Sequence, residues 1–246
     1  MIVRKSKHGL HIILHSAHGL LAAKIAHEIK PDLRPINWLE TIISISDHDD
    51  RQLNFDEKDY LSKLGVPLDF TECHDSINEI VKRMQRVIRL AVNKSSWVRL
   101  MISYHLEYLY SDMRAESKRI DSFLTHEETE RKLVHQLYNI SDTKGREIYQ
   151  ILLFCDRLSL ILCKDETPSI GRFLEINKTI GNKHYVIERR EDNKLMISPW
   201  IFEKDEFELQ IEERLIEQLS FNSSKEFENI LLSTPPTLLS WTLIKA

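Results

Sequence analysis

Glycine and cysteine are scarce in this chain, and their scarcity argues against several classes of protein. Six glycines among 246 residues leave no Gly-x-Gly-x-x-Gly or Walker loop for binding phosphates, and no Gly-x-Ser-x-Gly turn for a nucleophilic serine. The three cysteines, Cys73, Cys155 and Cys163, form neither an even-numbered disulfide framework nor a Cys-x-x-Cys metal motif. Dinucleotide-binding, P-loop, serine hydrolase and disulfide-scaffold proteins are therefore disfavoured.

Positive charge is not in excess either. The chain has 34 lysines and arginines against 38 aspartates and glutamates, which gives a formal net charge of −4. Proteins dedicated to nucleic-acid binding usually present a basic face. We therefore expect no dedicated nucleic-acid partner, while a local basic pocket for a phosphate stays compatible with this balance.

Long hydrophobic runs are also missing. The longest apolar stretch, residues 151–163, contains Asp156 and Arg157 and is too short to span a membrane. The opening residues do not have the pattern of a signal peptide, because His11 and His15 break their short apolar run. We expect a cytoplasmic protein without a membrane partner.

The residues that are present describe a soluble globular protein. Hydrophobic residues make up 42% of the chain and charged residues 29%, enough for a sizeable core with a polar surface. The length fits one domain with an elaboration. We expect a single domain over residues 1–246, with a helical core at 16–165 and β-rich elaborations at 1–14 and 183–246.

The helical core is predicted from apolar residues at helical spacing. The cleanest stripe recurs at i, i+3, i+4 and i+7, and its members are Ile77, Ile80, Val81, Met84, Val87, Ile88 and Ala91. The two chain ends instead show short runs of strand period, such as 207–211. The predicted fold class is α+β, mainly helical: a helical bundle beside a small antiparallel sheet formed by strands from both ends. A sheet made from the tail alone is the alternative.

An ordered set of metal-type ligands is the most informative feature of the chain. His18 begins one apolar helical pattern, the pair His48-Asp49 closes a second, and Asp156 lies inside a third. Imidazole and carboxylate are ligands that suit Mn, Fe, Co, Ni or Zn. Three distant segments would have to converge to form one site for such a divalent ion.

Asp156 carries the strongest physical argument for this site. Its apolar neighbours at helical spacing place it on a buried helix face, where an ionised carboxylate is costly unless it is paired or binds a metal. Arg157 is a poor partner, because adjacent helical residues point in different directions. We predict that His18, His48, Asp49 and Asp156 share a metal ion; a structural salt bridge is the alternative for Asp156.

Three further residues are candidates for the same site. His105 projects from an apolar stripe and is either a hydrogen-bonded core residue or a ligand for a second metal or the substrate. Asp50 follows the His-Asp pair and is a general base, a partner that holds a ligating imidazole, or a plain loop carboxylate. Arg157 could clamp an anionic substrate, although exposed arginines are common.

The ligand order resembles that of the HD superfamily of metal-dependent phosphohydrolases, whose helical core carries His, His-Asp and Asp in this sequence. The segments 18–26 and Asp156-Arg-Leu are similar to the first and last ligand helices of that superfamily. The whole chain resembles domain-of-unknown-function family 3891, an uncharacterised bacterial family that brings no known activity. The matching runs are Met1-Ile-Val-Arg, Asp47-His-Asp-Asp50, Ser103-Tyr-His105, Cys155-Asp-Arg-Leu-Ser159 and Ser198-Pro-Trp-Ile-Phe202.

The HD resemblance implies an HD-like helical bundle and a function. It implies a metal-dependent phosphohydrolase that acts on a phosphate ester or nucleotide, with His18, His48, Asp49 and Asp156 around the metal. In some HD proteins an extra histidine, in the position of His105, serves a second metal or the substrate. The alternative is a non-catalytic ligand-binding or regulatory protein that uses the same polar cluster to bind a small anionic or phosphorylated ligand.

Overall fold

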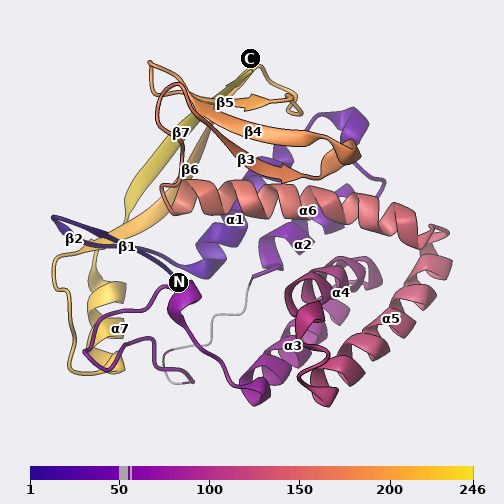
Figure 1. Ribbon diagram of the computed structural model, residues 1–246, viewed down its shortest axis with the longest axis horizontal. Helices are drawn as coiled ribbons and strands as arrows, with labels where there is room; N and C mark the ends of the chain where they lie inside the picture. The colour runs from indigo at the N-terminus through magenta and orange to yellow at the C-terminus, as the bar shows by residue number, and fades with distance from the viewer. Residues whose placement is uncertain (50–54, 56, 246) are drawn as a thin grey trace.

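The computed structural model describes residues 1–49, 55 and 57–245. Its α-helices are α1 (His15–His27), α2 (Trp38–Asp47), α3 (Ile77–Val92), α4 (Ser96–Tyr110), α5 (Lys118–Tyr138), α6 (Asp142–Cys163) and α7 (Ser224–Ser233). Helix α6 crosses the molecule with most of the sheet on one side and helices α3, α4 and α5 on the other side (Figure 1). Helix α6 therefore joins the two layers, together with α1, which contacts the sheet as well as α2 and α6.

Serines begin the four helices from α3 to α6. The hydroxyls of Ser76, Ser95, Ser117 and Ser141 each accept a hydrogen bond from the backbone N–H three residues later. Such caps satisfy one of the N–H groups that a helix start leaves without a partner. The apolar stripe predicted for α3 packs against α4 and α5 as expected; all its members are buried except Ile77, which is partly buried.

The described residues form a sheet of seven strands in the order β1-β2-β6-β7-β5-β4-β3. Its strands are β1 (Ile2–Ser6), β2 (Gly9–Ile13), β3 (Phe173–Lys178), β4 (His184–Arg189), β5 (Leu195–Ser198), β6 (Glu206–Ile216) and β7 (Thr237–Lys245). All neighbours are antiparallel except β5 and β7, which are parallel. The sheet is strongly curled, and the hairpin β1–β2 lies at one of its edges (Figure 1).

The predicted fold class, an HD-like helical bundle with a small antiparallel sheet from the chain ends, is wrong. The sheet is large and mixed, and it includes β3, which follows α6 directly. Residues 1–14 do form the predicted hairpin, and β2 pairs with β6, so a sheet made from the tail alone is wrong as well. Alternating burial along β6 shows which residues face the core, but such a pattern does not specify which strand lies next to it.

The main hydrophobic core lies between the sheet and α6 with α1. Fully buried members include Leu21 and Ile25 of α1, Leu152 and Leu158 of α6, and Ile197 of β5. A second cluster joins α3, α4 and α5, and a third lies under β1, β2 and α7. Among the described residues no helix has the length and apolar character that a membrane crossing requires.

Candidate metal centre

Three helices bring the four predicted ligands together. His18 lies in the first turn of α1, His48 and Asp49 follow the last turn of α2, and Asp156 lies in the middle of α6. One ligand atom from each of the four side chains lies within 4.8 Å of the others. The group is buried, so these residues form a cluster that could hold a metal ion.

A glycine allows α1 and α2 to approach each other at this point. A Cβ atom on Gly19 would lie 2.2 Å from the backbone oxygen of Ser46, a distance that real side chains do not reach. Because Gly19 has no side chain, the helices pack backbone to backbone beside the cluster. The imidazole rings of His18 and His48 consequently lie with their centroids 5.2 Å apart.

The Nε2 atoms of both histidines face the two carboxylates. Nε2 of His18 lies 3.2 Å from Oδ1 of Asp156, and Nε2 of His48 lies 3.1 Å from the same oxygen. Each Nε2 is 3.7 Å from Oδ2 of Asp49. Two nitrogens and two oxygens therefore surround one small space.

Hydrogen bonding directs His48 toward that space. Its Nδ1 lies 2.6 Å from the backbone oxygen of Ile45, and because a carbonyl can only accept, Nδ1 carries the proton. In the neutral ring, Nε2 then bears the lone pair. Despite their proximity, Nε2 of His48 and Oδ1 of Asp156 make no hydrogen bond within the described part of the chain, although both are buried. Buried polar atoms in this state are expensive, and a shared cation would satisfy them.

The charge of Asp156 is favoured by its surroundings. Burial raises the pKa of this carboxyl, but the positive charge that His48 and His18 carry when they are protonated lowers it further than burial raises it. The resulting pKa lies well below the usual range, so the group is an anion near neutral pH. A carboxylate in that state is ready to bind a cation.

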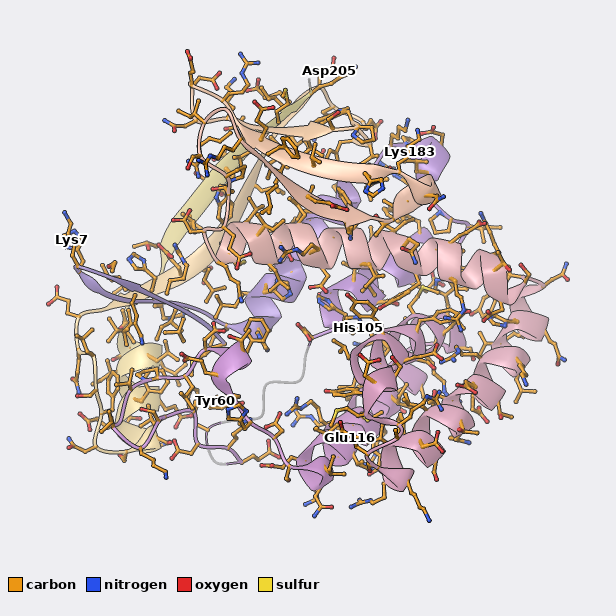
Figure 2. The ribbon with its side chains drawn as sticks, in the orientation of Figure 1. Lys7, Tyr60, His105, Glu116, Lys183 and Asp205 are labelled. Carbon is orange, nitrogen blue, oxygen red and sulfur yellow. The ribbon has the colours of Figure 1, made fainter. Side chains whose placement is uncertain are left out.

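The remaining predicted site residues lie at or beyond the edge of the cluster. His105, which is labelled in Figure 2, lies on α4. The centroid of its ring lies 5.0 Å from that of His48, and its Nδ1 is 3.2 Å from the hydroxyl of Tyr149. His105 is thus beside the four ligands, not among them. Arg157 is part-exposed, and its guanidinium pairs with Glu166 at 3.5 Å. Asp50 lies outside the described residues.

Two residues that support the cluster were not predicted from the sequence. Gly19 could have been noticed, because a glycine beside a ligand on an apolar helix suggests a close approach. Ser159 is fully buried, and its hydroxyl lies 2.9 Å from Nδ1 of His18. Its spacing from Asp156, three residues along one helix, places both on neighbouring positions of the same face.

The chain was compared with known families, curated proteins and solved structures. Residues 1–218 match the family model described as a protein of unknown function, DUF3891. The chain therefore belongs to this family, as its motifs predicted. No curated protein and no solved structure matches it.

Proposed function

We propose that this protein is a metal-dependent phosphohydrolase that acts on a phosphate ester or nucleotide. The observation that carries the proposal is the buried convergence of His18, His48, Asp49 and Asp156 from three helices. The order of these ligands along the chain is also that of the HD superfamily of metal-dependent phosphohydrolases, which supports the same chemistry.

The donor set fits a divalent transition metal. Two neutral imidazoles and two carboxylates carry a combined charge of about −2, which balances a divalent ion in a buried position. Mixed nitrogen and oxygen donors favour Mn, Fe, Co, Ni or Zn over Ca or Mg, which prefer oxygen ligands alone. When bound, such an ion supplies Lewis acidity for activating water and polarising a phosphoryl oxygen.

The residues of the chain itself have distinct roles in this proposal. The side chains of His18 and His48 are fully buried, so the surrounding protein fixes their positions. The side chain of Asp156, in contrast, is 15% exposed. A substrate would therefore approach from the side of Asp156. The ion pair of Arg157 with Glu166 is long and part-exposed, so little energy is needed to free this guanidinium for a phosphate. Asp50, directly after Asp49 in the sequence, is the proposed base or positioning carboxylate.

The test combines metal analysis with a substrate panel. Protein purified without a chelating tag should contain metal in near-stoichiometric amount, and phosphomonoesters, phosphodiesters and nucleotides should be assayed with added Mn²⁺ or Ni²⁺. Hydrolysis should disappear with a chelator and in Asp49→Ala. Asp47→Ala is the matched control, because Asp47 lies two residues earlier and pairs with Lys94 on the outside of α2.

Two results would count against the proposal. Activity that persists in both Asp49→Ala and Asp156→Ala would come from another site or a contaminant. Bound metal without turnover of any panel member would instead favour a protein that binds a small anionic ligand and does no chemistry on it.

A further inference from the structure

Ser159 makes two hydrogen bonds that together define one proton position on His18. Its hydroxyl oxygen lies 2.8 Å from the backbone oxygen of Asp156 and 2.9 Å from Nδ1 of His18. A serine hydroxyl has a single proton to donate, and the carbonyl of Asp156 can only accept one. With that proton given to Asp156, the oxygen of Ser159 can only accept from His18.

We propose that Ser159 is the positioning residue that keeps the proton of His18 on Nδ1 and so presents the Nε2 lone pair to the metal. The inference rests on the metal site of the proposed function, but not on the reaction assigned to it. With this proton position, both histidines carry their proton on Nδ1 and their lone pair on Nε2, because the backbone oxygen of Ile45 holds the proton of His48 on Nδ1. The tautomer of a ligating histidine is commonly set by such a partner on its other nitrogen.

The position of Ser159 on α6 gives this contact a further consequence. Asp156 and Ser159 are three residues apart on one helix, so the same element supplies a ligand and orients the imidazole opposite it. Any movement of α6 that displaced the carboxylate of Asp156 would also displace the acceptor for His18. The position of the ligand and the orientation of the imidazole are therefore coupled through α6.

Ser159→Ala removes the acceptor, and Ser44→Ala is the matched control. Ser44 is fully buried on α2, four residues before His48, and its hydroxyl donates to the backbone carbonyl of Glu40 at 2.7 Å. Both substitutions delete one buried hydroxyl that donates to a helical carbonyl. Only Ser159→Ala deletes a hydroxyl that also accepts from a histidine.

The first measurement is the tautomer of His18 in the metal-free wild-type protein. Nitrogen-detected NMR of labelled histidines, at a pH well above the usual imidazole pKa of about 6.5, distinguishes a proton on Nδ1 from one on Nε2. We expect Nδ1–H in the wild type and in Ser44→Ala, and loss of that preference in Ser159→Ala. A wild-type His18 protonated on Nε2 would overturn the inference.

The second measurement is the affinity for Zn²⁺ alone, by competition with a chelating dye. Loss of a partner of this kind weakens metal binding by about 10- to 100-fold, so we expect this change in Ser159→Ala and none in Ser44→Ala. Ser159→Thr, which keeps the hydroxyl, should recover most of the affinity if it folds. Equal affinity in Ser159→Ala and the wild type would refute the role of Ser159, and a wild type that binds no Zn²⁺ would overturn the site itself. Tight binding without phosphate-ester hydrolysis would defeat only the proposed function.

Discussion

At the scale of single residues, replacing the candidate ligand Asp156 tests metal binding through its effect on stability. A ligand that binds only the folded state adds about 2.7 kcal/mol at a concentration one hundred times its Kd. We expect wild-type protein to gain stability with added Zn²⁺ or Mn²⁺, and Asp156→Asn to lose that gain. Without metal, Asp156→Asn should be somewhat less stable than the wild type, because the lowered pKa of Asp156 means that folding favours its charged form.

Thermal unfolding with and without metal measures this difference. Glu147→Gln is the control, since Glu147 lies on the same helix, is more than half exposed and pairs with Lys144. It should respond to metal as the wild type does. An Asp156→Asn variant that is stabilised by metal to the same extent as the wild type would show that Asp156 is not a ligand.

The cysteines give a second prediction at this scale. Burial raises the pKa of the Cys155 thiol well above its usual range, with a further rise from the charge of Asp156, and burial raises that of Cys163 to about 12. Thiolate is the reactive form, so both should resist a disulfide reagent in the folded protein. Cys73 is part-exposed. We expect one rapidly reacting thiol in native protein and three after denaturation; rapid reaction of a second native thiol would contradict this.

The residue scale also shows what a sequence can reveal about a site. His18, His48, Asp49 and Asp156 were recognisable because each of these polar residues begins, ends or interrupts an apolar helical pattern, and such a placement is typical of a functional site. Ser159 was not recognisable as a partner of His18, since the two are far apart in sequence and serines are common. Which side chain accepts from an imidazole depends on how the helices pack.

At the scale of elements, the contact between α1 and α2 leaves no room for a side chain at Gly19. In Gly19→Ala, the new methyl group would overlap the backbone oxygen of Ser46, and backbone cannot move aside as a flexible side chain would. Overpacking of this kind costs about 1–3 kcal/mol. The helices would separate beside His18 and His48, so metal affinity should fall together with stability.

Chemical denaturation and Zn²⁺ titration of Gly19→Ala test this coupling. Gly171→Ala is the control: Gly171 has φ +76, and nothing lies within 4 Å of its added Cβ. That substitution should cost about 1 kcal/mol through backbone strain alone and leave Zn²⁺ affinity unchanged. Wild-type affinity in Gly19→Ala would mean that the close approach of α1 and α2 does not organise the ligands.

The elements also differ in how well their patterns could be interpreted. Helices α3 and α6 were predictable because a helix buries its stripe through contacts that repeat along its own sequence. Strand β3 was missed, and a shift of register between Glu175 and Asn177 interrupts its pairing with β4. The parallel pairing of β5 with β7 could not be predicted from the local sequence pattern, because β6 and α7 lie between these two strands in the chain.

At the scale of the whole molecule, the last strand in sequence is interior to the sheet. The family model ends at residue 218, just after β6, yet β7 lies between β6 and β5 and pairs with both. A chain truncated after residue 218 would leave two strand edges open in the middle of the sheet. Exposed edges of this kind promote aggregation, so we expect the truncated chain to be insoluble or to lack the cooperative unfolding of the full chain.

Two substitutions on β7 test the same idea without truncation. Leu243 is fully buried in the main core, whereas Leu238 on the same strand is 66% exposed. Leu243→Ala should lower the free energy of unfolding by about 2–5 kcal/mol, and Leu238→Ala should change it by no more than about 0.5 kcal/mol. Denaturant titration measures both. Equal, small effects would indicate that β7 is dispensable. A large loss confined to Leu243→Ala would mean that the sheet, and the α6 packed on it with Asp156, depends on residues beyond the end of the family model.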